Sequence, residues 1–244
     1  AVQRNLAALR GDGVLLVGPD EGEMACGEYG PGRMAEPPAI VAAVAAALAP
    51  RGVGPLAGRH VLVTSGPTHE PIDPVRYIAN RSSGRQGTAI AEALVRRGAR
   101  VTFVTGPAEA SRPEGATVVE VGSAAEMLAA AEAALPADAA VFAAAVADWH
   151  VVGAGGSKVK KAASGEPPTF VLAENPDILR AIAGLSTGRP RLVVGFAAET
   201  DDVLANATAK RVRKGADWIV ANDVSPATGI MGGTENAVTL VTAA

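Results

Sequence analysis

Cysteine, aromatic residues and lysine are all scarce in this chain of 244 residues. The single cysteine, Cys26, excludes an internal disulfide and fits a reducing compartment. Because aromatic residues make up only 3% of the chain, its core must be built from alanine, valine, leucine and isoleucine. The formal net charge of −3 argues against nucleic-acid binding through a general basic field.

Long apolar runs are missing as well. No stretch approaches the roughly 20 apolar residues that span a bilayer, and the N-terminus lacks the basic segment that opens a signal peptide. We therefore expect a cytoplasmic protein with neither a membrane nor a nucleic acid as its partner. Apolar residues still make up 48% of the chain, which is enough for a substantial core.

Two short segments hold all five lysines, whereas the arginines are spread along the chain. Lys158, Lys160 and Lys161 form one run, and Lys210 and Lys214 stand one helical turn apart. Lysine is a compact point charge on a flexible stem, while arginine is a rigid planar fork. Two lysine clusters indicate a site that grips phosphate groups, and a solvated surface run is the competing interpretation.

The chain divides into two parts at a linker rich in proline and glycine, residues 50–58. Residues 1–50 are too few for an independent domain unless a disulfide or a metal ion stabilises them. In this part we expect a strand at 14–17, a glycine-rich loop at 22–34 and a helix at 40–48. Residues 51–244 form the second and larger domain.

From residue 59 onward, short apolar runs alternate with helical patterns. Strands are expected at 61–64, 101–105, 141–145, 192–196, 218–221 and 238–241, and helices at 84–97, 123–135, 176–185 and 201–214. Ser123 and Glu126 predict a capping box at the start of the helix at 123–135. Continuous apolar strands separated by helices are typical of a parallel sheet that is covered on both faces. The sequence therefore predicts a doubly wound α/β fold with a mostly parallel, Rossmann-like sheet. Ligands of such folds bind beyond the carboxyl ends of the strands.

The loop after the first of these strands ends where a helix begins, at Ser83 and Gly84. Free N–H groups at such a point favour an anion. Arg76 and Asn80 are four residues apart, so one helical turn would place them side by side. The glycine pattern after Ser83 is too loose for a dinucleotide fingerprint, and no acidic residue ends the second strand.

Further candidate residues follow the later strands. The small residues after Phe142 would let a flat ring lie against the backbone, and Asp148 would bind a ribose hydroxyl or a metal ion, or merely cap a helix. Lys158 lies in a glycine-flanked segment that has the character of a mobile flap. Lys210 and Lys214 would grip the outer phosphates of a triphosphate.

Residues from about 59 to 244 resemble phosphopantothenate–cysteine ligase, the synthetase half of a bacterial bifunctional coenzyme A protein. The matching stretches occur in the same order: 73–84, 143–148, 158–161, 175–178, 195–200 and 210–223. Residues 1–50 resemble the tail of the partner half, a flavin-dependent phosphopantothenoylcysteine decarboxylase. Residues 25–34 look like the substrate flap of that half, in which Cys26 would be the proton donor. FMN would bind to a part of the decarboxylase half that lies outside this sequence.

This resemblance implies a two-step, CTP-dependent reaction. The carboxylate of 4′-phosphopantothenate would attack CTP to give an acyl-cytidylate and pyrophosphate, and the amine of L-cysteine would then displace CMP. Arg76, Asn80 and Ala144 would act on the acyl-cytidylate, and Lys158 would help to form it. The family uses Mg²⁺, here assigned to Asp148, and a homodimer in which one protomer's loop completes its partner's site; the full-length protein would form a larger homo-oligomer. The implied nucleotide site consists of Phe142, Ala143, Ala144, Asp148, Lys158, Asn175, Pro176, Asp177, Ile178, Phe196, Lys210 and Lys214.

Two other functions remain open on the residues alone. One is an NADP-dependent reductase, although neither Tyr29 nor Tyr77 is followed four residues later by the lysine that short-chain reductases use. The other is a nucleotide-binding module without catalytic activity. The residues also leave open whether the nucleotide is CTP or ATP.

Overall fold

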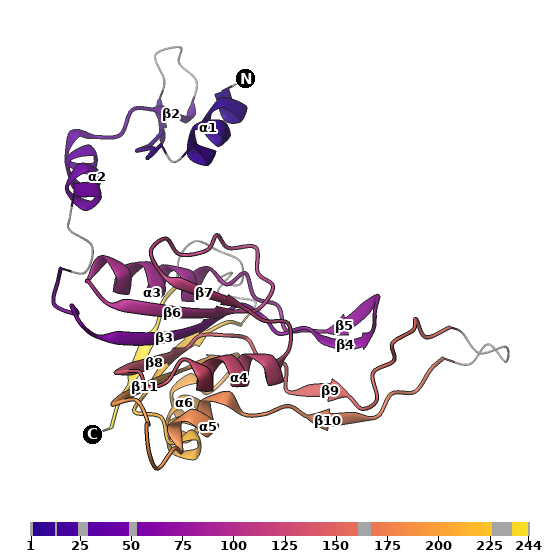
Figure 1. Ribbon diagram of the computed structural model, residues 1–244. Helices are drawn as coiled ribbons and strands as arrows, with labels where there is room; N and C mark the ends of the chain where they lie inside the picture. Colours follow the sequence, from indigo (N-terminus) through magenta and orange to yellow (C-terminus); the bar gives the residue numbers. More distant parts are fainter. Residues whose placement is uncertain are drawn as a thin grey trace. The chain divides into compact units, whose positions relative to one another are not determined.

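The computed structural model describes residues 2–12, 14–23, 29–48, 53–160, 167–225 and 236–243 (Figure 1). The chain separates into two compact units, Ala1–Pro50 and Arg51–Ala244. In the described part of the chain, no helix is both long and apolar enough to cross a membrane. Cys26 and Lys161 lie outside the described residues.

The smaller unit contains two helices and a hairpin. Its elements are α1 (Val2–Gly11), β1 (Asp20–Glu23), β2 (Tyr29–Arg33) and α2 (Pro37–Leu48). The helix expected at 40–48 is confirmed as α2, but the strand expected at 14–17 is wrong. Residues 14–17 are irregular, and Leu15 is 68% exposed. The expected glycine-rich loop instead contributes β1 and β2, which pair antiparallel.

A seven-stranded sheet organises the larger unit, in the order β13-β12-β11-β8-β3-β6-β7. All neighbouring strands are parallel except β12 and β13, which are antiparallel. This confirms the predicted fold class. The strands are β3 (His60–Ser65), β6 (Arg100–Thr105), β7 (Thr117–Glu120), β8 (Ala139–Phe142), β11 (Leu192–Glu199), β12 (Trp218–Asp223) and β13 (Thr239–Val241).

Helices cover both faces of this sheet because side chains alternate along each strand. On one face, Val61 and Val63 pack with Ala91 of α3. On the other face, Leu62 belongs to a core cluster with residues of α4, α5 and α6 (Figure 1). The predicted capping box of α4 is confirmed, since Ser123 and Glu126 bind each other's backbone N–H groups. The helices are α3 (Arg85–Arg96), α4 (Ala124–Ala133), α5 (Ile178–Ala183) and α6 (Val203–Lys214).

Two small hairpins, which the sequence did not indicate, project from the carboxyl edge of the sheet (Figure 1). One pairs β4 (Glu70–Asp73) with β5 (Arg76–Ile78), and the other pairs β9 (Trp149–Val151) with β10 (Leu172–Glu174). We call these four strands, together with residues 152–160, the arm. The expected helical turn between Arg76 and Asn80 is wrong, because Arg76 begins β5 and the residues after Ile78 are irregular.

Candidate functional site

A cavity of about 1520 Å³ opens at the carboxyl edge of the sheet, where β3 and β8 meet. The chain leaves β3 toward β6 on one side, and from β8 it continues toward β11 on the other side. Such a reversal of strand order leaves a crevice that commonly holds ligands in this class of fold. The cavity is lined by residues 80–87 before and within α3, 142–149 after β8, 174–179 around the start of α5, and Thr64, Ala89, Phe196, Ala198, Lys210, Lys214, Asn222, Val224 and Asn236.

Small residues after β8 form one wall of this cavity. The N–H groups of Ala143 and Ala145 donate to the carbonyl oxygens of Thr64, near the end of β3, and of Gly66, in the loop after it, over 3.1 and 2.9 Å. The N–H of Ala147 donates to Thr68 Oγ1 over 3.0 Å. Because backbone groups point alternately to opposite sides of an extended chain, those of Ala144 point away from this loop. The wall thus combines small side chains with backbone groups, as a flat ring requires.

The side chain of Asn80 crosses to the same wall. Its Nδ2 donates to the carbonyl oxygen of Val146 over 2.9 Å. This bond ties the segment before α3 to the segment after β8 and places an amide at the cavity edge. Asn80 and Ala144 thus line the same cavity, whereas the helical turn expected to place Arg76 beside Asn80 does not form.

Asn175 is fixed by three hydrogen bonds that the sequence did not reveal. Its backbone N–H donates to the carbonyl of Asp148 over 2.8 Å. Its Nδ2 donates to the carbonyl of Ala147 over 2.8 Å, and its Oδ1 lies 3.0 Å from His150 Nδ1. Because Oδ1 only accepts, we assign the His150 ring proton to Nδ1. His150 was missed because its partner lies 25 positions further along the chain.

Two lysines of α6, Lys210 and Lys214, bring positive charge into the cavity. Asp177 caps α5 by accepting from Arg180 N over 3.0 Å, and its other oxygen accepts a hydrogen bond from Lys214. Burial lowers the pKa of the Lys210 ammonium below its usual value, and the nearby charge of Lys214 lowers the pKa further. A bound polyanion would relieve both effects, so this pair is suited to phosphate groups.

Asp148 stands exposed on the cavity wall. The residues that follow it form β9 rather than a helix, so the helix-capping interpretation is wrong. Among the described residues, no group of three His, Cys, Asp or Glu side chains is placed to hold a metal ion. Magnesium is often held by one or two carboxylates together with substrate phosphates. Asp148 therefore fits a metal ion only as an added ligand of a metal–nucleotide complex.

A chain of amides, unnoticed in the sequence, connects three more elements around the cavity. Asn222 of β12 donates to Asn236 over 3.4 Å, and Asn236 donates to Gln86 of α3 over 3.2 Å. Asn236 belongs to the segment that leads into β13. No local pattern marks these three residues, because their contacts depend on the assembled sheet.

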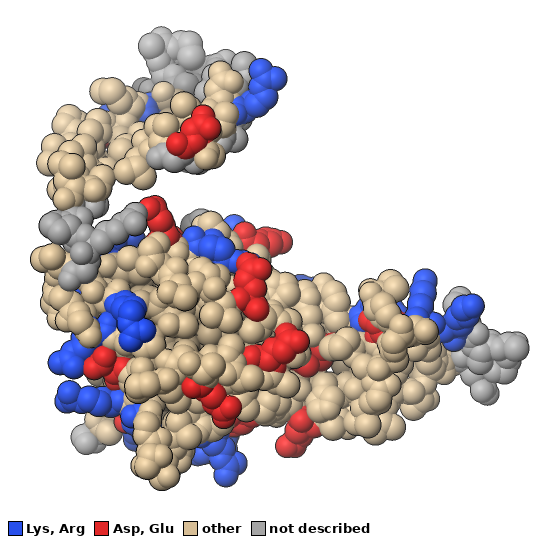
Figure 2. Space-filling model, in the orientation of Figure 1, with Lys and Arg blue, Asp and Glu red and all other residues tan. Residues whose placement is uncertain are grey.

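Two of the predicted residues lie elsewhere. Of the described residues, Arg76 and Lys158 belong to the arm and do not line the cavity. Lys158 and Lys160 are exposed where the arm reaches residues 161–166. Figure 2 shows basic side chains beside the grey atoms at this end of the arm. The four lysines in the described part of the chain are thus split between the cavity and the arm. All other described members of the predicted nucleotide site line the cavity, namely Phe142, Ala143, Ala144, Asp148, Asn175, Pro176, Asp177, Ile178, Phe196, Lys210 and Lys214.

Comparison with protein families places most of the chain in one of them. Residues 56–244 match the model of the DNA/pantothenate metabolism flavoprotein C-terminal domain. The chain is 45% identical over 242 residues to the coenzyme A biosynthesis bifunctional protein CoaBC of Escherichia coli K12, covering 98% of this chain and 59% of the relative. The CoaBC protein of Bacillus subtilis 168 is 40% identical over 242 residues, with the same coverage. The chain therefore spans about 59% of the length of these relatives.

Solved structures agree with this placement. The C-terminal domain of a CoaBC protein superposes with a TM-score of 0.62 and 35% identity, covering 79% of this chain and 84% of that domain. A DNA/pantothenate metabolism flavoprotein from Streptococcus pneumoniae also has a TM-score of 0.62. It is 23% identical and covers 76% of this chain and 93% of its own, so it supports the fold alone.

Proposed function

The chain belongs to the DNA/pantothenate metabolism flavoprotein C-terminal domain family, and on this premise we propose that it ligates 4′-phosphopantothenate to L-cysteine at the expense of CTP, in coenzyme A biosynthesis. One observation carries the proposal. A single cavity combines two lysines for a polyanion, a small-residue backbone wall for a ring, and the Asn80 amide for a carbonyl. The similarity to the C-terminal domain of CoaBC supports the same conclusion.

The nucleotide is proposed to lie along the wall after β8. Backbone groups of 142–144 would read the edge of the cytosine, and Phe196 would pack beside it, since both line the cavity. The segment 175–178 would hold the sugar and the first phosphate, close to Asp148. Lys210 and Lys214 would take the two outer phosphates, which become the leaving pyrophosphate.

The first step joins two anions. A carboxylate oxygen of phosphopantothenate attacks the α-phosphorus of CTP, an O–P bond forms, and the bond to pyrophosphate breaks. Cations must offset the repulsion between carboxylate and triphosphate. Asp148 would be the protein ligand of Mg²⁺ bound to the triphosphate, and the metal ion would supply part of this positive charge. Lys158 would act at the α-phosphorus that is attacked. Lys210 and Lys214 would act at the pyrophosphate that leaves.

The second step forms the amide. The amine of L-cysteine attacks the acyl carbon, the C–O bond to CMP breaks, and the amine loses a proton. Asn80 is proposed to hold the acyl carbonyl, because an amide can donate a hydrogen bond without competing as a nucleophile. Ala144 would leave room for the acyl group, and Arg76 would serve the same intermediate from the arm.

Arg76 and Lys158 need a way to reach this chemistry, since both belong to the arm. A homodimer offers it, if the arm of one protomer completes its partner's cavity. The relatives are longer than this chain, which covers 59% of their length. We propose that the additional residues form a decarboxylase half and that the full-length protein assembles into a larger oligomer. Residues 1–50 would belong to that half, with Cys26 as proton donor and FMN bound outside this chain.

A direct assay separates the ligase from a passive nucleotide-binding module. The chain is incubated with CTP, Mg²⁺, 4′-phosphopantothenate and L-cysteine, and pyrophosphate, CMP and the ligated product are quantified. We expect the three products in equal amounts over many turnovers. Without L-cysteine, pyrophosphate should stop at one for each cavity, and neither free CMP nor the ligated product should form. The reaction should be much slower when ATP replaces CTP. Absence of pyrophosphate release with the complete mixture would refute the proposal.

A further inference from the structure

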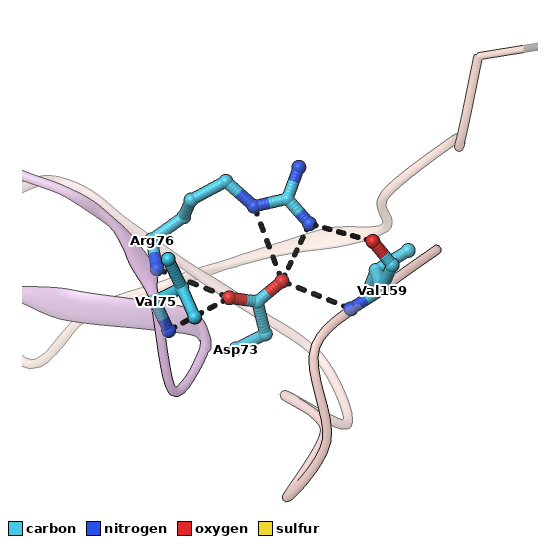
Figure 3. A network of polar contacts seen from close by, with 4 residues as sticks. All are labelled: Asp73, Val75, Arg76 and Val159. Carbon is cyan, nitrogen blue, oxygen red and sulfur yellow. Dashed lines mark hydrogen bonds and ion pairs between the residues drawn. The ribbon is translucent and has the colours of Figure 1, made fainter. Parts of the chain in front are cut away.

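The carboxylate of Asp73 accepts five hydrogen bonds at the turn between β4 and β5 (Figure 3). Its Oδ1 accepts from the backbone N–H groups of Val75 and Arg76, over 2.9 and 3.0 Å. Its Oδ2 accepts from Nε and Nη2 of Arg76, over 3.1 and 2.5 Å, and from the N–H of Val159 over 3.1 Å. The Asp73 side chain has no exposed surface, whereas that of Arg76 is 43% exposed.

The two oxygens therefore have different tasks. Oδ1 closes the local turn, while Oδ2 reaches a residue 86 positions further along the chain. Arg76 Nη2 also donates to the carbonyl of Val159 over 3.2 Å. Both backbone groups of Val159 are thus held by this pair of side chains. A backbone hydrogen bond from the N–H of Gly155 to the carbonyl oxygen of Ile72, over 3.4 Å, holds the same segment against β4.

This attachment is stable across the neutral pH range. The hydrogen bonds from the Arg76 side chain hold the pKa of Asp73 far below its usual value, and the N–H groups of Val75 and Val159 add to the effect. A carboxyl group with a lowered folded-state pKa stays charged, and its contribution is lost only in strong acid. A charged acceptor also makes each bond stronger than one between neutral groups.

Val159 lies between the two described lysines of the arm. Lys158 and Lys160 are exposed, while Val159 is half-buried. Lys158 is the direct neighbour of Val159 in the chain, so fixing both backbone groups of Val159 limits the positions that the Lys158 side chain can reach. A lysine on an untethered loop would lose conformational freedom whenever it met a phosphate, and a tethered one loses less.

From these contacts we propose that Asp73 and Arg76 form a latch that holds the lysine-bearing segment on the β4–β5 hairpin. Asp73 is a positioning residue, because it acts through Lys158 and touches no substrate. Arg76 also holds Val159, in addition to the role proposed for it at the acyl-cytidylate. The assignment rests on the proposed function only for the task of Lys158, whereas the latch itself is a property of the unliganded chain.

Asp73→Asn tests the latch selectively. An amide keeps one acceptor oxygen and replaces the other with a donor. The backbone N–H groups of Val75 and Arg76 are close in sequence and would keep the remaining oxygen as their acceptor. The new NH₂ group would then face the N–H of Val159 and the guanidinium of Arg76. Asp138→Asn is the matched control, because Asp138 accepts from an arginine, Arg59, and from the backbone N–H of His60, over 2.8 Å each, at the start of β3.

Amide hydrogen exchange at Val159 is measured by NMR in the free chain. We expect exchange to accelerate about tenfold or more in Asp73→Asn, as for the loss of a charge-assisted bond, and to stay within about twofold of wild type in Asp138→Asn. Arg76→Gln gives the same readout from a half-exposed position if Asp73→Asn does not fold. Unchanged exchange in the folded latch variants, or equal acceleration in the control, would overturn the latch.

Kinetics then test the positioning role. Single-turnover pyrophosphate release should fall in Asp73→Asn, and the double variant with Lys158→Gln should be no slower than Lys158→Gln alone, because groups acting as a unit are not additive. If the rate losses of the two single variants multiplied in the double variant, Asp73 would not act through Lys158. If wild type released no pyrophosphate, the ligase proposal would fail while the exchange experiment still decided the latch.

Discussion

Replacing Lys210 with methionine gives the sharpest prediction for the cavity. The substitution keeps the length and the apolar stem of the side chain but removes the ammonium group. Hydrogen bonds to charged groups contribute about 1.5–3 kcal/mol, so we expect CTP to bind about 10- to 100-fold more weakly. Arg213→Met is the control, because Arg213 lies on the same helix, is exposed and, among the described residues, is not part of the cavity lining.

The pH dependence of binding adds a second signature. Burial lowers the pKa of Lys210 in the free protein, and the phosphates of a bound nucleotide would raise it again. A group whose pKa rises on binding takes up a proton. CTP affinity should therefore fall as the pH rises through the free-state pKa of Lys210, and this dependence should be lost in Lys210→Met.

Isothermal titration calorimetry in two buffers of different ionisation enthalpy measures both quantities. The slope between the buffers counts the protons taken up with CTP, and the same titrations give the affinity. The reasoning is refuted if Lys210→Met binds CTP like wild type. It is also refuted if Arg213→Met loses as much affinity, because a general field of α6 would then explain the binding.

Three further predictions concern the intermediate, the metal and the packing beneath the loops. In Asn80→Asp a carboxylate would face the carbonyl of Val146, so acyl-cytidylate should accumulate while its conversion slows about tenfold or more; quenched-flow mass spectrometry would contradict this if no intermediate built up. Removing Mg²⁺ with EDTA should abolish pyrophosphate release, and release that continued would exclude the metal–nucleotide complex. Gly106→Ala should lower the free energy of unfolding by about 1–3 kcal/mol, because a Cβ there would lie 1.7 Å from the carbonyl oxygen of Pro67. Gly156→Ala, with nothing within 4 Å, is its control in urea titrations, and equal effects would refute the packing argument.

The sequence predicted the sheet because its central strands are continuous apolar runs. The segment at 61–64 is buried on both sides of the sheet, so apolar residues occupy consecutive positions from Val61 to Val63 instead of alternating with polar ones. Helix α4 was predicted from Ser123 and Glu126, whose capping contacts are local. Short-range signals of this kind can be read without knowing the neighbours of a segment.

The arm could not be read in this way. Strands β9 and β10 are three residues each and pair across a long loop, so their pairing depends on tertiary contacts. The spacing of Arg76 and Asn80 fitted a helix, but Asp73 draws Arg76 into the hairpin turn instead. The strand expected at 14–17 was wrong because apolar composition alone does not make a strand, which also needs a paired neighbour.

The lining of the cavity was predicted best at the ends of the strands. Residues that follow β8 and β11 meet at one edge of the sheet whatever the intervening loops do. His150 and the amide chain through Asn236 were missed because their partners lie 25 and 150 positions away. The position of Lys158 also escaped prediction, because Val159 is held by a carboxylate 86 residues earlier in the chain.

The most direct test of the central claim is a single-turnover reaction in which L-cysteine is withheld. The chain is mixed with CTP, Mg²⁺ and 4′-phosphopantothenate and quenched, and the products are identified by mass spectrometry. The account predicts one pyrophosphate for each cavity, with CMP joined to the acyl group until L-cysteine is added and free CMP appears. Release of CDP with an acyl phosphate, or pyrophosphate that forms only after L-cysteine arrives, would contradict it.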